Sequence, residues 1–305
     1  MRARDEWRCA LSMMAAVAGT ALAPGRAVAL FFGQLKSTAW LGVAVASALF
    51  GMITGMLAWR GQAFGGSDAL SGAGRLTAML RSLFAALLLA VMLAAAGDLG
   101  ALTLPVSHGY ALGAALTLLA ALGIGLAPGN HGAAMGLCAV AFAAVFYAAL
   151  AADPRPVRLY LNGETELRLA GSVSGALLLG LLYAALNGCA AGMAAPGMSA
   201  ARPAGVGLKC GALLAAVLAL GCRALARGGD ALLAHPEPWV ALAARMGLPG
   251  FWCCAALGGL SALTTTATAV RSLLRHADSS QHRRDLAVCL LVAAVLFGAL
   301  SAGRL

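Results

Sequence analysis

Residues 82–102 of the chain read SLFAALLLAVMLAAAGDLGAL, an apolar run that contains one charged residue, Asp98. A helix of this length rises about 30 Å, which is the thickness of the hydrocarbon core of a bilayer. The run therefore predicts a helix that crosses a membrane.

Apolar runs of similar length fill most of the remaining chain. Together they predict an all-α fold, a polytopic transmembrane bundle of about nine spans in one integral membrane domain over residues 1–305. The predicted spans are Cys9–Leu35, Thr38–Trp59, Ser82–Leu102, His108–Leu126, Gly132–Ala152, Ala170–Ala195, Gly205–Arg223, Pro249–Val270 and Leu286–Ala302.

The composition indicates the same class of protein. Hydrophobic residues make up 61% of the chain and charged residues 10%, and the mean hydropathy is +0.87. Soluble domains carry about 25% charged residues. So little charge cannot cover a water-facing surface, so we expect the lipid bilayer to be the main partner and exclude a soluble enzyme.

The net charge of +10 does not indicate nucleic-acid binding, because the arginines are scattered at the ends of apolar runs. Basic residues at such places set topology and meet anionic lipid headgroups. With the N-terminus inside, the inner segments hold twelve Lys and Arg and the outer segments eight. The dense loop Arg271–Arg284 then lies inside, so we expect the N-terminus inside and a multi-pass topology.

Residues Asp153–Leu169 carry the one strand signal of the sequence. Two short alternating segments flank Asn162-Gly163, a dipeptide that suits a type I′ turn. We expect a small external β-hairpin here.

Motifs of known enzymes are absent from the sequence. There is no HExxH, no GxSxG elbow and no His/Cys metal spacing, so we expect no enzyme activity and no cofactor. The eight cysteines lie in or beside apolar runs and are expected to be packing residues.

Three stretches carry polar or helix-breaking residues within apolar runs. The first, Gly19–Arg26, contains Pro24-Gly25 and ends in a cation, which indicates either a broken helix or a span whose Arg26 snorkels to the interface. The second contains Tyr183 and Asn187-Gly188, which fits a second unwinding or an interhelical hydrogen bond. The third is Ser261–Thr266, whose hydroxyls suit a hard cation or bond to their own helix.

Taken together, these stretches resemble the YkvI-type family, uncharacterised bacterial membrane proteins distantly related to the amino acid–polyamine–organocation transporters. Gly19, Ala23, Gly25, Arg26 and Phe31-Phe32 match its opening motif GAGFASGQExxxFF, and residues 92–97 look like its MLAGAG. Residues 183–187 are similar to its YVxYN, and residues 265–266 to its TTAVG. The chain has Ala27 where the family has an acidic residue and Pro24 where the family has serine.

The resemblance implies a LeuT-like architecture of inverted repeats, with a first repeat over residues 9–152 and an incomplete second repeat over residues 170–302 that lacks the last helix. It also implies a bacterial cytoplasmic membrane. Helices one and six are then expected to be interrupted near Leu22–Gly25 and Asn187–Gly192 and to face each other at mid-bilayer. A small cation would meet the Leu22 and Ala23 carbonyls and the Thr265 and Thr266 hydroxyls. A solute would meet Gly25, Arg26, Tyr183 and Asn187.

The function expected on these grounds is that of a secondary transporter for a small polar or amine-containing solute, with Na⁺ or H⁺ as the candidate coupling ion. The alternative is a non-transporting membrane scaffold or partner-binding protein with a degenerate transporter fold. The two differ in how many polar groups converge inside the membrane.

Overall fold

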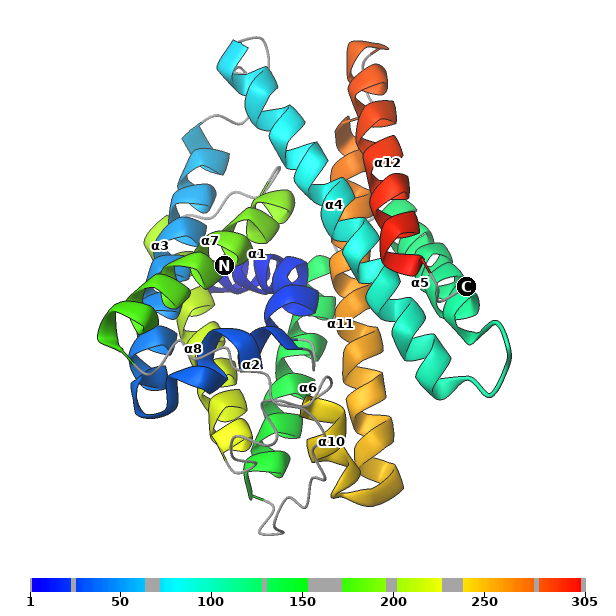
Figure 1. The fold of residues 1–305 in the computed structure, drawn as a ribbon. Helices are drawn as coiled ribbons and strands as arrows, with labels where there is room; N and C mark the ends of the chain where they lie inside the picture. The colour runs from blue at the N-terminus through cyan, green and yellow to red at the C-terminus, as the bar shows by residue number, and fades with distance from the viewer. Residues whose placement is uncertain are drawn as a thin grey trace.

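A computed structural model describes residues 2–22, 26–63, 72–127, 131–152, 172–195, 202–226, 238–276 and 280–302. Every regular element in these ranges is a helix (Figure 1). The elements are α1 (Arg2–Val17), the π-helix η1 (Ala18–Leu22), α2 (Arg26–Phe32), the 3₁₀ helix η2 (Gly33–Thr38), α3 (Ala39–Ala63), α4 (Gly72–Thr103), α5 (Gly109–Leu126), α6 (Gly132–Ala152), α7 (Val173–Ala194), α8 (Pro203–Ala226), α10 (Pro238–Ala244), α11 (Gly247–His276) and α12 (Ser280–Ser301).

Eight of the described helices are long and apolar enough to cross a membrane, namely α3, α4, α5, α6, α7, α8, α11 and α12. They coincide with the last eight predicted runs. The class of polytopic helical membrane protein is therefore confirmed. The predicted hairpin Asp153–Leu169 lies outside the described residues.

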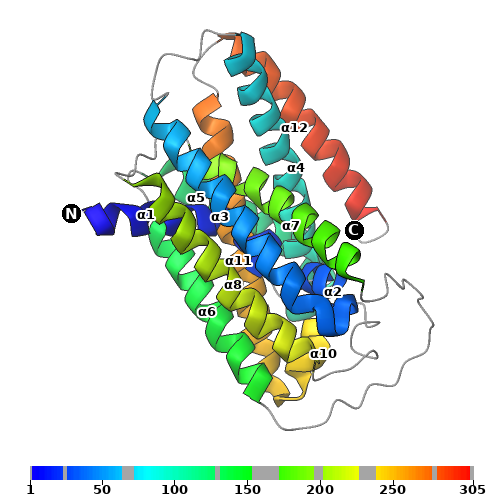
Figure 2. The ribbon, with the colours of Figure 1, turned by 90° about the vertical axis from the view of Figure 1, so that its left-hand side faces the viewer.

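The first predicted run differs from the others because it is built from short pieces. The α-helix stops at Val17, a π-helical turn follows, and a new α-helix begins at Arg26. In both views α1 runs steeply across the direction of α3, α6 and α8 (Figures 1 and 2). The α-helix thus gives way to π-helical hydrogen bonding at Ala18, and most of the expected interruption near Leu22–Gly25 lies outside the described residues.

Contacts with α8 show how far this broken segment extends through the bundle. Glu6 pairs with Lys209 near the start of α8, Cys210 Sγ lies 3.7 Å from the Ala10 carbonyl oxygen, and Val28 lies beside Gly221 near the end of α8. Residues 209 to 221 of a helix span about 18 Å. The first segment therefore contacts α8 at several levels along its length.

Glycines let α3 and α8 approach each other in antiparallel order. A Cβ atom on Gly51 would lie 2.9 Å from the Gly207 carbonyl oxygen, and a Cβ atom on Gly211 would lie 2.9 Å from that of Ser47. Lipid supplies no hydrophobic drive for helix association, so close van der Waals packing of small residues replaces it. α7 packs against α3 of this pair.

Candidate functional site

The candidate site is built around η1, where the first membrane segment changes from α-helical to π-helical hydrogen bonding. Single π-turns are uncommon and are frequent at functional sites. Pro24 supplies no backbone donor, and its ring disfavours the helix that would precede it. The local sequence thus explains why the first segment does not continue as one α-helix.

One side of η1 is held by α11. The Gly19 amide donates to Thr265 Oγ1 at 2.7 Å, and the Thr265 hydroxyl in turn donates to the Ala15 carbonyl at 3.4 Å. A Cβ atom at position 19 would lie 2.9 Å from Thr265 Oγ1. The threonine can cap this amide at such short range because residue 19 is a glycine.

The other side of η1 is held by α7. The Tyr183 hydroxyl donates to the Ala21 carbonyl at 3.1 Å, and the Thr20 hydroxyl donates to Asn187 Oδ1 at 2.8 Å. Asn187 Nδ2 donates back to the Tyr183 carbonyl at 2.9 Å, which fixes the orientation of the amide. We call the side chains of Thr20, Tyr183, Asn187 and Thr265 the clasp.

Two aromatic rings from α2 pack on the same tyrosine. The centroids of Phe31 and Phe32 lie 5.3 and 4.9 Å from that of Tyr183, with interplanar angles of 70° and 66°. Edge-to-face packing of this kind is a favoured aromatic geometry. The pair Phe31-Phe32 of the opening motif therefore orients the side chain that caps Ala21.

Several of the residues predicted for the site do meet. Tyr183 and Thr265 bond the η1 backbone, and Asn187 bonds the Thr20 side chain of the same π-helix, in which Leu22 is the last residue. Arg26 begins α2. Ala23 and Gly25 lie outside the described residues.

Thr266 is fully buried, and among the described residues its Oγ1 has no hydrogen-bond partner. Contact with the break is therefore made by Thr265 and not by its neighbour.

The expected interruption of the sixth predicted span near Asn187–Gly192 is wrong, because α7 is continuous from Val173 to Ala194. Asn187 bonds the carbonyl of its own preceding turn and so stays within the helix. Gly188 serves packing, since a Cβ atom there would lie 2.8 Å from Ile53 Cγ2 on α3. A glycine allows a helix to unwind but does not by itself break the helix, and α7 stays continuous.

The polar groups of the site are neutral oxygen atoms and amides that satisfy one another. The described residues contain no cluster of three or more His, Cys, Asp or Glu side chains that would suit a metal ion. Carbonyl, hydroxyl and amide oxygens of the kind found at Ala15, Thr265 and Asn187 are ligands for hard cations. The donor set therefore suits a monovalent cation or an ammonium group better than a transition metal.

Thr20 and an ion pair were not expected from the sequence. Thr20 lies inside the first polar stretch, but its hydrogen bond to Asn187 depends on how the two helices are rotated, which the sequence does not specify. Glu6, 7% exposed, pairs with Lys209, whose ammonium also lies 5.5 Å from the centre of the Trp7 ring. Both charged residues lie near the ends of predicted spans. From sequence alone, charges at such positions are interpreted as setting the orientation of the protein in the membrane.

Comparisons with known proteins give no family for the chain: no family model, no curated protein and no solved structure matches it.

Proposed function

We propose that this integral membrane protein is a secondary transporter for a small polar or amine-containing solute, and that the clasp around η1 is its binding region. The observation that carries the proposal is the break in the first segment, whose backbone is tied by side chains from two other spans. Broken helices are where transporters expose backbone groups to ions and solutes at membrane depth.

The clasp gives such a solute specific partners. If the Tyr183 hydroxyl turns away, the Ala21 carbonyl becomes an acceptor for an ammonium group. If the Thr265 hydroxyl turns, its oxygen and the Ala15 carbonyl can coordinate Na⁺. Each exchange replaces a hydrogen bond within the clasp by a contact with the solute or with the ion.

The resemblance to YkvI-type proteins supports this proposal, which includes a bacterial cytoplasmic membrane as the location. The N-terminus inside is part of the same proposal and is supported by the Lys and Arg counts of the loops. Coupling to Na⁺ or H⁺ belongs to the same proposal. The acidic residue of the family motif is replaced by Ala27, so coupling would rely on the neutral oxygens of the clasp.

A scaffold or partner-binding protein is the second candidate function. It is favoured by the fact that each polar side chain of the clasp already has a protein partner. In this case the clasp would hold a degenerate helix break closed, and no solute would compete with it.

Solute binding separates the two candidates. Purified protein should be unfolded in detergent in the presence of a panel of amino acids, polyamines and small amines, in NaCl and in choline chloride. A ligand at a hundredfold excess over its Kd stabilises the folded state by about 2.7 kcal/mol. A transporter should be stabilised by at least one class of solute, and Asn187→Ala should lose this effect while Cys189→Ala on the exposed face of α7 keeps it. Absence of stabilisation by every solute would favour the scaffold.

A further inference from the structure

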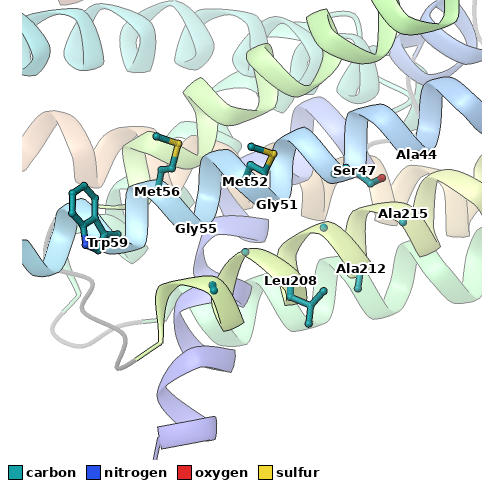
Figure 3. Close-up of a pocket in the computed structure, with 14 residues that line it drawn as sticks. Ala44, Ser47, Gly51, Met52, Gly55, Met56, Trp59, Leu208, Ala212 and Ala215 are labelled. Carbon is teal, nitrogen blue, oxygen red and sulfur yellow. The ribbon is translucent and has the colours of Figure 1, made fainter.

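An apolar groove runs along the outer face of the α3–α8 pair, away from the clasp. It has a volume of about 750 Å³, and its floor is formed largely by the close-packed glycines of the two helices. Figure 3 shows its two walls, with Met52, Met56 and Trp59 on α3 and Leu208, Ala212 and Ala215 on α8. The walls are raised by Met52 and Met56, each 63% exposed, and by Leu208, 76% exposed.

The groove is open on its outer side and has one basic end. Arg60 follows Trp59 in the last turns of α3, and Arg202 directly precedes α8; both are exposed. The Pro203 carbonyl oxygen lies next to Gly55, one turn from Trp59, so the two arginines stand at the same end of the pair. Neither α3 nor α8 contains an acidic residue.

We propose that this groove is a binding site for one anionic phospholipid, with an acyl chain along the groove and the phosphate between Arg60 and Arg202. Trp59 lines the same end of the groove. Tryptophan is favoured at the level of the lipid headgroups, which is where the proposal places this end. In the topology with the N-terminus inside, this end faces the cytoplasmic leaflet, where basic residues meet anionic lipids.

A transmembrane helix is the competing occupant, and Ser47 distinguishes it from a lipid. Ser47 lines the groove, is 5% exposed, and its hydroxyl has no partner among the described residues. It lies thirteen residues before Arg60, about 20 Å along α3, which is too deep for a headgroup to reach. A packed helix would supply a carbonyl there, whereas an acyl chain would not. Lipid binding should therefore be indifferent to Ser47→Ala.

Native mass spectrometry of the full chain, titrated with phosphatidylglycerol or phosphatidylcholine, tests the proposal. The expected result is one tightly retained phosphatidylglycerol per chain and weaker retention of phosphatidylcholine. Arg60→Gln and Arg202→Gln should each weaken phosphatidylglycerol binding about fivefold. Arg223→Gln, an exposed arginine at the other end of α8, should not change it.

A second variant tests the groove itself without touching charge. Ala212→Phe fills an exposed wall position, so it should reduce retention of both lipids while the circular dichroism of the protein stays unchanged. Equal retention of the two lipids by the unmodified protein, or equal weakening by Arg60→Gln and Arg223→Gln, would overturn the proposal. A dimer that dissociates on Ser47→Ala would also overturn it and assign the groove to a second copy of the chain.

Discussion

Gly19 joins the first segment to α11 through a backbone hydrogen bond. Its amide is capped by a threonine hydroxyl from α11, and a side chain at this position would collide with that hydroxyl. In hydrocarbon an uncapped amide has no water to bond, so the cap is what makes a π-turn tolerable at this depth.

Thr265→Val is expected to destabilise the protein by removing this cap while keeping the shape of the side chain. Interhelical hydrogen bonds in membranes contribute about 0.5–2 kcal/mol, so the free energy of unfolding should fall by about that amount. Thr268→Val is the matched control, because the Thr268 hydroxyl, among the described residues, bonds to Thr264 of its own helix. Unfolding in a detergent–denaturant titration measures both, and equal effects of the two substitutions would contradict the assigned role of Thr265.

Tyr183→Phe should loosen η1 without disturbing the aromatic packing. It removes the hydrogen bond to the Ala21 carbonyl and leaves the ring against Phe31 and Phe32. A loss of about 1 kcal/mol raises local opening roughly fivefold, so amide hydrogen exchange over residues 18–22 should accelerate by that factor.

Tyr110→Phe is the control for this experiment, because its hydroxyl bonds Ser301 far from the break. Exchange over residues 18–22 that responds equally to both substitutions would show that the effect is global and that Tyr183 does not cap the break.

At the scale of single residues, the sequence predicted which polar side chains would meet but not how. Tyr183, Asn187 and Thr265 stood out because polar groups are costly in apolar runs. The pairing of Thr20 with Asn187, and the choice of Thr265 over Thr266, depend on the rotation of each helix about its own axis. A short motif does not specify that rotation.

At the scale of elements, apolar length predicted the eight continuous spanning helices, because the bilayer sets their length. Proline and glycine together predicted a break near Leu22–Gly25, and the described residues just before it form a π-helix. In α7, glycine alone gave a wrong prediction, because Gly188 is a packing position against α3 and Asn187 bonds within its own helix.

The pairing of α3 with α8 should be sensitive to the smallest added side chain. A Cβ atom on Gly207 would collide with the Gly51 carbonyl oxygen, which is backbone and cannot rotate away. Gly207→Ala should therefore destabilise the protein by about 1–3 kcal/mol. Gly298→Ala on α12 meets nothing within 4 Å, so the helix preference for alanine should stabilise it by about 0.5–1 kcal/mol. If Gly207→Ala and Gly298→Ala changed the free energy of unfolding in the same direction, the close contact between α3 and α8 would be contradicted.

At the scale of the whole molecule, we predict nine crossings with the N-terminus inside, which would place the two chain ends on opposite sides of the membrane. Eight described helices are long and apolar enough to cross, and the broken first segment is predicted to be the ninth crossing. Alkaline phosphatase fused after Leu305 should be active, and phosphatase fused after Arg284 should be inactive. Activity after Arg284 would reverse the orientation, and inactivity at both positions would remove one crossing.

Uptake into proteoliposomes tests most directly the claim that the clasp around η1 serves transport. The initial rates of uptake of labelled amino acids, polyamines and small amines should be measured under an inward Na⁺ gradient, an inward proton gradient and no gradient. We predict that the unmodified protein exceeds empty liposomes for at least one solute under a gradient. The double variant Thr265→Val, Thr266→Val should lose this uptake, and Thr268→Val should retain it. Uptake at the level of empty liposomes for every solute, or undiminished uptake by the double variant, would contradict the account.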